Sequence, residues 1–268
     1  MPDVWGAVAE QDGETQARLA EVLELRGADP QQQKLRRTFL DDIPFGDAAR
    51  VLEVGCGTGV LTRMLARRHG VASVVGVDLA PSLLERAREL TADLPNVTFE
   101  TADALALPFD DVRFDLVVFD STLTHVPDPG RAIAEAVRVL RGEGVLAAFD
   151  GDYSTVTVAL GPNDPLQACV DAMVEGSVSD RWVVRKLPAL MRAAGLTDVR
   201  LRSHGYVETT EGGYMLTIVD RGVDMLHADG QVDDETAAAL RAEARRRVDT
   251  GTFFGHIAYA GVIARRPG

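Results

Sequence analysis

The chain reads Val51-Leu52-Glu53-Val54-Gly55-Cys56-Gly57-Thr58-Gly59 at the point where an apolar run gives way to a helical pattern. The residues before the first glycine are apolar except for Glu53, which is typical of a buried strand. Glycines at three alternate positions let the backbone turn tightly and let a ligand approach closely. The segment therefore predicts a strand, a ligand-binding loop and a helix, in that order.

A second apolar run, over residues 72–77, ends in Asp78, 23 positions after Gly55. A carboxylate in that place suits the two ribose hydroxyls of a nucleoside cofactor. The dinucleotide-binding fingerprint also has a strand, a glycine turn and a later acid, but its third glycine would fall at Val60. Glu53 is a second departure from that fingerprint. Both departures weigh against a dinucleotide site.

Short apolar runs then alternate with amphipathic helical patterns, which predicts an α/β fold whose mostly parallel sheet carries helices on both faces. We expect strands at residues 50–54, 72–77, 97–101, 114–119, 144–149, 199–206 and 253–264. Residues 1–45 predict a helical cap, and residues 46–268 the α/β domain, with a helical insertion at about 212–250. Neither helical segment is needed for the sheet, so both are candidates for a lid over its carboxyl edge.

The composition restricts the classes of partner and compartment. The 41 acidic and 28 basic residues give a formal charge of -13, which would repel nucleic acid and anionic lipid. The basic run at 241–247 alternates with Ala and Glu and indicates a solvated helix face. No apolar run approaches the roughly 20 residues needed to cross a bilayer, and the first residues lack a signal-peptide pattern. With only Cys56 and Cys169, a structural disulfide is not expected, and the protein is expected to be cytoplasmic.

Residues 53–59 follow the pattern acid-x-Gly-x-Gly-x-Gly, with which the chain resembles the class I S-adenosylmethionine-dependent methyltransferases. Residues 74–79, 101–104 and 114–120 look like the family's second-strand motif, adenine-contacting turn and fourth-strand motif. Residues 140–144 resemble the turn before strand five, although the family usually has Pro and Gly where this chain has Gly142 and Glu143. The resemblance implies a Rossmann-like seven-stranded sheet, S-adenosylmethionine as cofactor and S-adenosylhomocysteine as product.

The resemblance also implies roles for single residues. The three loop glycines would line the amino acid and ribose of the cofactor, Asp78 would bind the ribose hydroxyls, and Glu53 would orient the methionine end. Asp103 would contact the adenine amino group, although an Asp after a strand is also a plain helix cap. The expected cofactor contacts are Glu53, Gly55, Cys56, Gly57, Thr58, Gly59, Asp78, Leu79, Asp103, Ala104, Asp120, Ser121 and His125.

Methyl transfer from a sulfonium is an in-line displacement, so the protein must mainly align a nucleophile and exclude water. His125, after the fourth strand, could accept a proton from the attacking group, but the family often has His there whatever the acceptor. Tyr153 is the second candidate, with a surface loop as the alternative. The candidate substrate contacts, which could equally be core aromatics, are Tyr153, Tyr206, Tyr214, Arg221 and Phe254.

Absences narrow the acceptor class. The Asn/Asp-Pro-Pro-aromatic tetrapeptide of nucleic-acid amino methylation is replaced by Asp120-Ser121-Thr122-Leu123, and the thiols of an arsenite methylator are missing. Asp150 and Asp152 alone are a weak metal site, so no metal is expected. The chain looks most like the branch that methylates quinones and specialised metabolites, which implies a small acceptor methylated on O, N or C. A cyclase or a non-catalytic cofactor-binding protein on the same fold are the alternatives; the sequence does not indicate an oligomeric state.

Overall fold

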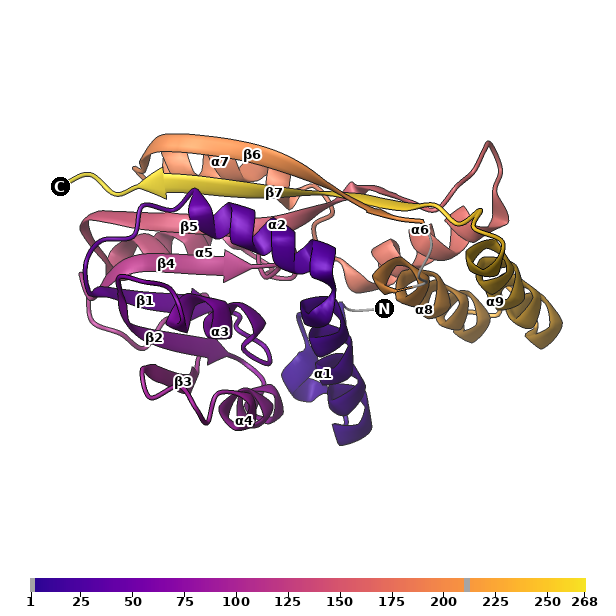
Figure 1. Cartoon of the computed structure of the whole chain (residues 1–268), viewed down its shortest axis with the longest axis horizontal. Helices are drawn as coiled ribbons and strands as arrows, with labels where there is room; N and C mark the ends of the chain where they lie inside the picture. The colour runs from indigo at the N-terminus through magenta and orange to yellow at the C-terminus, as the bar shows by residue number, and fades with distance from the viewer. Residues whose placement is uncertain (1–2, 210–212) are drawn as a thin grey trace.

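The computed structural model describes residues 3–209 and 213–268, and a seven-stranded sheet runs through it (Figure 1). The strands are β1 (Ala49–Val54), β2 (Val71–Asp78), β3 (Val97–Thr101), β4 (Phe114–Asp120), β5 (Leu140–Thr157), β6 (Thr197–Glu208) and β7 (Gly255–Arg265). Their spatial order is β3-β2-β1-β4-β5-β7-β6. The pairs from β3 to β5 are parallel, and β7 is antiparallel to both neighbours. The predicted Rossmann-like α/β fold is confirmed.

Helices cover both faces of this sheet. They are η1 (Val8–Glu10), α1 (Gly13–Ala28), α2 (Pro30–Asp41), α3 (Val60–Ala66), α4 (Pro81–Leu90), α5 (Pro129–Val139), α6 (Pro165–Ser177), α7 (Val183–Ala193), α8 (Tyr214–Ala228) and α9 (Asp234–Asp249). Successive strand residues point to opposite faces, so Val51 packs in the cluster that contains α2 and α3 residues. Leu52 packs in the cluster that contains α5 and α7 residues. Both faces are thus buried, which explains why β1 is apolar almost throughout.

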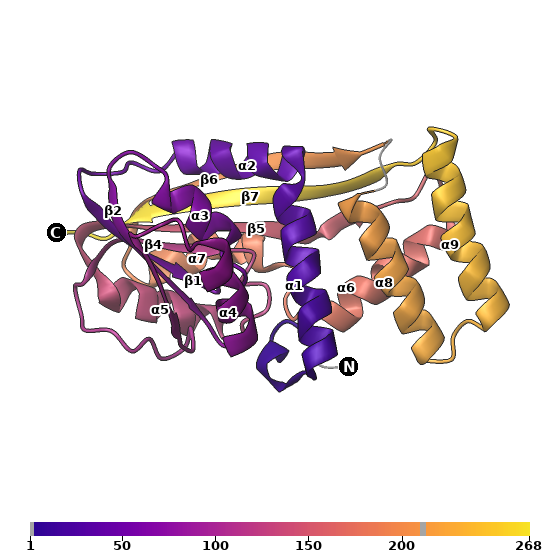
Figure 2. The ribbon, with the colours of Figure 1, turned by 60° about the horizontal axis from the view of Figure 1, so that its bottom comes forward.

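The N-terminal helices are defined by capping residues. The Asp12 carboxylate accepts the Thr15 amide and begins α1, and the Asp29 carboxylate accepts the Gln32 amide at 2.7 Å and begins α2. Pro30 fills the first position of α2, where a missing N–H costs nothing. In Figure 2, α1 stands at the carboxyl ends of the strands, between the α/β body and the helices α6, α8 and α9.

Two strands, β5 and β6, are longer than predicted, whereas β7 begins two residues later than predicted and ends one residue later. β5 extends from Leu140 to Thr157, because its pairing with β7 continues to Thr157 and His256, beyond the predicted end at residue 149. The helices α6, α8 and α9 pack together beyond the short strands (Figures 1 and 2). The backbones of α6 and α8 are in contact, since a Cβ at Gly222 would overlap the Cys169 carbonyl.

The predicted insertion before the last strand contains α8 and α9. Gly212, its expected first residue, lies outside the described residues, as do the first two residues of the expected 1–45 cap. In the described part of the chain, no helix combines the length and apolarity that crossing a membrane requires.

Candidate functional site

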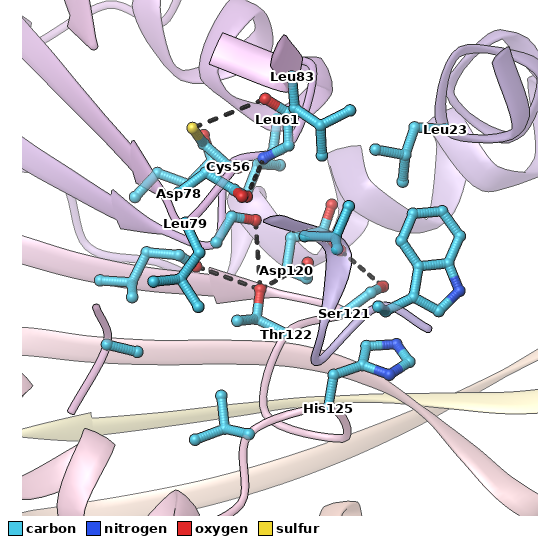
Figure 3. A pocket seen from close by; sticks show the side chains of 18 of the residues that line it. Leu23, Cys56, Leu61, Asp78, Leu79, Leu83, Asp120, Ser121, Thr122 and His125 are labelled. Atoms are coloured by element: carbon cyan, nitrogen blue, oxygen red, sulfur yellow. Dashed lines mark hydrogen bonds between the residues drawn. The ribbon is translucent and has the colours of Figure 1, made fainter. Parts of the chain in front are cut away.

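A cavity of about 240 Å³ lies at the carboxyl ends of β1, β2 and β4 (Figure 3). This is the edge at which open α/β sheets bind ligands. Its lining comes from the N-terminal residues with α1 and α2, the end of β1 with the glycine loop and the start of α3, the end of β2 with Leu83 of α4, the 102–105 turn, and the end of β4 with the loop after it. The cavity therefore joins the predicted loop to helices that the sequence placed only as a cap.

The glycine loop requires glycine at each of its three positions. The backbone φ is +73° at Gly55, +53° at Gly57 and +78° at Gly59, a region that side chains disfavour. A Cβ at Gly55 would also overlap the Thr122 side chain. The amides of Gly55 and Cys56 donate to the Val77 carbonyl at 2.8 and 2.9 Å, which fixes the loop on β2. The backbone conformation and these hydrogen bonds therefore hold the loop against β2 in the cavity wall.

Asp78 ends β2 at the cavity wall. One carboxylate oxygen accepts the Gly57 amide at 2.8 Å and the other accepts the Ala80 amide at 3.0 Å, so the carboxylate also fixes the loop (Figure 3). Burial raises the pKa of Asp78, although these amides oppose the shift. A ligand with two hydroxyl donors would find a partly satisfied carboxylate at this place.

Glu53 is a buried acid of the cavity whose pKa is strongly shifted. It is buried in β1, where its side chain accepts a hydrogen bond from Thr62. Burial raises the pKa of Glu53 to about 8, and the Thr62 hydroxyl opposes the shift. A cationic ligand group beside this carboxyl would favour its ionised form, so the site suits an ammonium.

A buried ion pair lies in the cavity wall. Arg36 of α2 donates from Nε to Asp120 at 2.7 Å, and both side chains are almost fully buried. The sequence did not predict this role of Arg36, because a charged residue in a helical pattern normally indicates solvent exposure.

His125 is held by a residue from the start of the chain. Its Nδ1 lies 2.7 Å from the Asp3 carboxylate, which also accepts the amide and hydroxyl of Ser179 at 3.0 and 2.8 Å. Burial would raise the pKa of Asp3, but the bond to His125 and the charge of that ring lower it below its usual value. The arrangement leaves Nε2 of His125 as the nitrogen available to a ligand. No local motif signals Asp3 in the sequence.

Helix α1 is tied to the glycine loop. The Thr58 hydroxyl donates to Glu24 at 2.5 Å, and Arg63 of α3 donates to the same carboxylate at 2.8 Å. Leu23 lines the cavity beside these bonds (Figure 3). The N-terminal segment is therefore part of the cavity wall.

The expected cofactor contacts meet at this cavity with one exception. All of them line it except Gly59, which instead begins α3. Asp103 accepts the Leu105 amide at 2.8 Å and closes a turn, so the alternative of a helix cap does not apply. The role of each residue toward a cofactor stays a prediction.

None of the predicted substrate contacts is among the described residues that line the cavity. The Tyr206 hydroxyl lies 3.0 Å from a carboxylate oxygen of both Asp29 and Glu208, and Phe254 precedes β7 beside His256. Tyr153 and Tyr214 are buried, and the Arg221 guanidinium lies 5.9 Å from the Trp5 ring centre. Burial raises the pKa of Tyr153 well above its usual value, which weakens the case for this phenol as a proton acceptor. No group of three or more His, Cys, Asp or Glu side chains suits a metal ion within residues 3–209 and 213–268.

Part of the chain is similar to known proteins. Residues 52–148 match a family described as a methyltransferase domain. The demethylmenaquinone methyltransferase of Staphylococcus aureus (strain Newman) is 33% identical over 129 residues, which cover 48% of this chain and 54% of that protein. The chain spans about half the length of the curated relatives it matches.

Solved structures share the fold. The YcgJ protein of Bacillus subtilis superposes with a TM-score of 0.63 at 18% identity, over 87% of this chain and 98% of that one. The [4+2]-cyclase SpnF superposes with a TM-score of 0.55 at 22% identity, over 90% of this chain and 84% of that one. At these identities, the likeness concerns the fold alone.

Proposed function

We propose that the chain is a class I S-adenosylmethionine-dependent methyltransferase that methylates O, N or C of a small, partly apolar metabolite, since residues 52–148 match a methyltransferase domain. The cavity that brings the glycine loop, Glu53 and Asp78 together with His125 carries the proposal. The similarity to a demethylmenaquinone methyltransferase supports an acceptor of quinone-like size.

The cavity residues fit S-adenosylmethionine. The glycine loop offers a backbone without side chains, the buried Glu53 carboxyl suits the ammonium of the methionine part, and Asp78 suits the ribose hydroxyls. Asp103 and Ala104 would border the adenine. When bound, the cofactor supplies a methyl group activated by a sulfonium.

The protein's own contribution is alignment, exclusion of water and removal of a proton. Trp5, Leu23 and Val126 give the cavity an apolar wall that excludes water from the reacting groups. His125 accepts the proton of the attacking group at Nε2, while the bond from Nδ1 to Asp3 fixes the orientation of the ring. Positioning supplies most of the rate.

Calorimetry with S-adenosylhomocysteine tests the cofactor assignment. We expect Asp78→Ala to bind at least about 30-fold more weakly than wild type, because about 2 kcal/mol of hydrogen bonding is lost. The control is Asp93→Ala, which removes an exposed acid paired only with Arg67 and should bind like wild type. Equal binding by wild type and Asp78→Ala would exclude this site.

Turnover of labelled S-adenosylmethionine with a metabolite extract tests the reaction, and mass spectrometry identifies the product. A gain of one methyl supports a methyltransferase, whereas a rearranged product without that gain supports a cyclase. We expect His125→Gln to lower turnover about 100-fold with unchanged S-adenosylhomocysteine affinity. A parallel loss of affinity would mean that His125 only packs against the cofactor.

A further inference from the structure

Arg26 of α1 lines the cavity and has no partner among the described residues. Its Nε is buried, and no hydrogen-bond acceptor reaches it in the part of the chain that the structure describes. The ion pairs of the neighbouring elements use other arginines, since Arg36 binds Asp120 and Arg63 binds Glu24. An arginine stays charged in proteins, and a buried charge is costly unless an anion compensates it. The cavity wall therefore carries a guanidinium that suits an anionic group of a ligand.

The acids of the cavity do not supply that anion. Each carboxylate of the described lining accepts a hydrogen bond from a group other than Arg26: Glu53 from Thr62, Asp78 from the amides of Gly57 and Ala80, Asp103 from the Leu105 amide, and Asp120 from Arg36. The compensating anion for Arg26 is therefore not among the described lining residues.

The second half of α1 lies against the glycine loop and the start of α3. A Cβ at Gly57 would lie 2.8 Å from the Leu23 side chain, and a Cβ at Gly27 would lie 2.8 Å from the Val60 side chain. Leu23 and Arg26 are three positions apart, so they share one face of α1, and both line the cavity. Because the loop glycines are the predicted contacts of the amino acid part of the cofactor, Arg26 is suitably placed for that part.

The amino acid part of the cofactor carries an ammonium and a carboxylate on the same carbon atom. A site for it needs one acid and one cation close together. The buried Glu53 carboxyl suits the ammonium. Of the arginines in the described lining, Arg36 is bound to Asp120, which leaves Arg26 for the carboxylate. A guanidinium can bind a carboxylate through two parallel, charge-assisted hydrogen bonds.

We propose that Arg26 binds the carboxylate of the amino acid part of the cofactor, and that α1 thereby restricts the site to cofactors that keep this carboxylate. This inference rests on the proposed function. A nucleoside without the carboxylate leaves the charge of Arg26 uncompensated and binds more weakly. Because Arg26 belongs to α1, the same ion pair fastens this helix over the glycine loop when the cofactor binds.

The test compares S-adenosylhomocysteine with its decarboxylated analogue, which keeps the adenosine and the ammonium. Calorimetry measures the affinity of wild type and Arg26→Gln for both ligands. We expect wild type to prefer S-adenosylhomocysteine at least about tenfold, because only this ligand pairs with the guanidinium. Arg26→Gln should lose most of that preference, while its affinity for the analogue stays within about threefold of wild type.

Two further variants control the comparison. Arg18→Gln is the matched control, because Arg18 is exposed on the same helix and its loss should leave the wild-type preference unchanged. Arg26→Lys keeps the charge but not the planar fork of donors, so its preference should lie between those of wild type and Arg26→Gln.

Three outcomes overturn the inference. They are equal binding of the two ligands by wild type, a wild-type preference in Arg26→Gln, and an equal loss of affinity for both ligands in Arg26→Gln. The last would mean that Arg26 only holds α1 in place. If wild type binds neither ligand, the cofactor assignment itself is wrong, whereas binding of both without a preference contradicts only the role of Arg26. The two failures are therefore distinguishable.

Discussion

The glycine-loop side of the cavity consists of neighbours in the sequence, whereas its opposite side consists of residues that are far apart. Val51 to Asp78 form one strand-loop-helix-strand unit. On the other side, Asp3 meets His125 across 122 positions and Arg36 meets Asp120 across 84. The contrast shows that the glycine unit can be recognised locally, while the opposite side forms only after the N-terminal helices have docked.

The largest expected effect concerns the glycine loop. Gly55→Ala places a Cβ at a φ of +73° and against Thr122, so the loop must move. We expect S-adenosylhomocysteine affinity to fall about a thousandfold, or roughly 4 kcal/mol, in calorimetry. Retention of wild-type affinity would show that the loop geometry does not matter for the cofactor.

The next effect concerns the contact between α6 and α8, which lies outside the cavity. Gly222→Ala forces α8 away from the Cys169 carbonyl of α6, and we expect a loss of about 3 kcal/mol in the free energy of unfolding by denaturant titration. Cofactor affinity should stay within about threefold of wild type, because no residue of α6 or α8 in the described chain lines the cavity. A large loss of affinity would mean that the α6–α8 contact is coupled to the cavity.

Gly13→Ala is the control for that comparison. Gly13 begins α1, and a Cβ there would meet no described atom within 4 Å. We expect no loss of stability, since Ala is the better helix residue by up to about 1 kcal/mol.

A pH-dependent effect follows from the pKa of Glu53. Because the folded-state pKa of Glu53 is raised to about 8, the stability it contributes is full below its unfolded pKa and is lost as the pH rises toward 8. Relative to Glu53→Gln, wild type should lose about 3.5 kcal/mol of unfolding free energy between pH 5 and pH 8. Denaturant titrations of both proteins at the two pH values measure this difference. A pH-independent difference would contradict the buried, protonated state of Glu53.

The smallest effect tests a departure from the family pattern. Glu143 has a φ of +62° at the place where the family usually has Gly. Replacing it by Gly removes backbone strain. We therefore expect Glu143→Gly to raise the free energy of unfolding, measured by denaturant titration, by about 1 kcal/mol. Glu143→Ala keeps the strain and serves as the control. Equal gains in both variants would assign the effect to the side chain instead.

The sequence predicted the sheet and the strand-loop-helix geometry of the glycine loop for a physical reason. Residues 51–59 encode their own strand periodicity and backbone turn, so the loop needs no distant partner to be recognised. By contrast, the predicted end of β5 at residue 149 was too early, because the continuation to Thr157 depends on pairing with β7. Asp3 and Arg36 were missed because their partners, His125 and Asp120, are far away in the sequence.

The contact of α6 and α8 at Gly222 limits how this helical part of the molecule can move. Two helices whose backbones touch cannot slide or rotate past each other without first separating. Any rearrangement of α6 and α8 must therefore carry the two helices together as one rigid body. The bending that such a motion requires falls on the strand ends and connections that join these helices to the sheet, rather than on the interface between the helices.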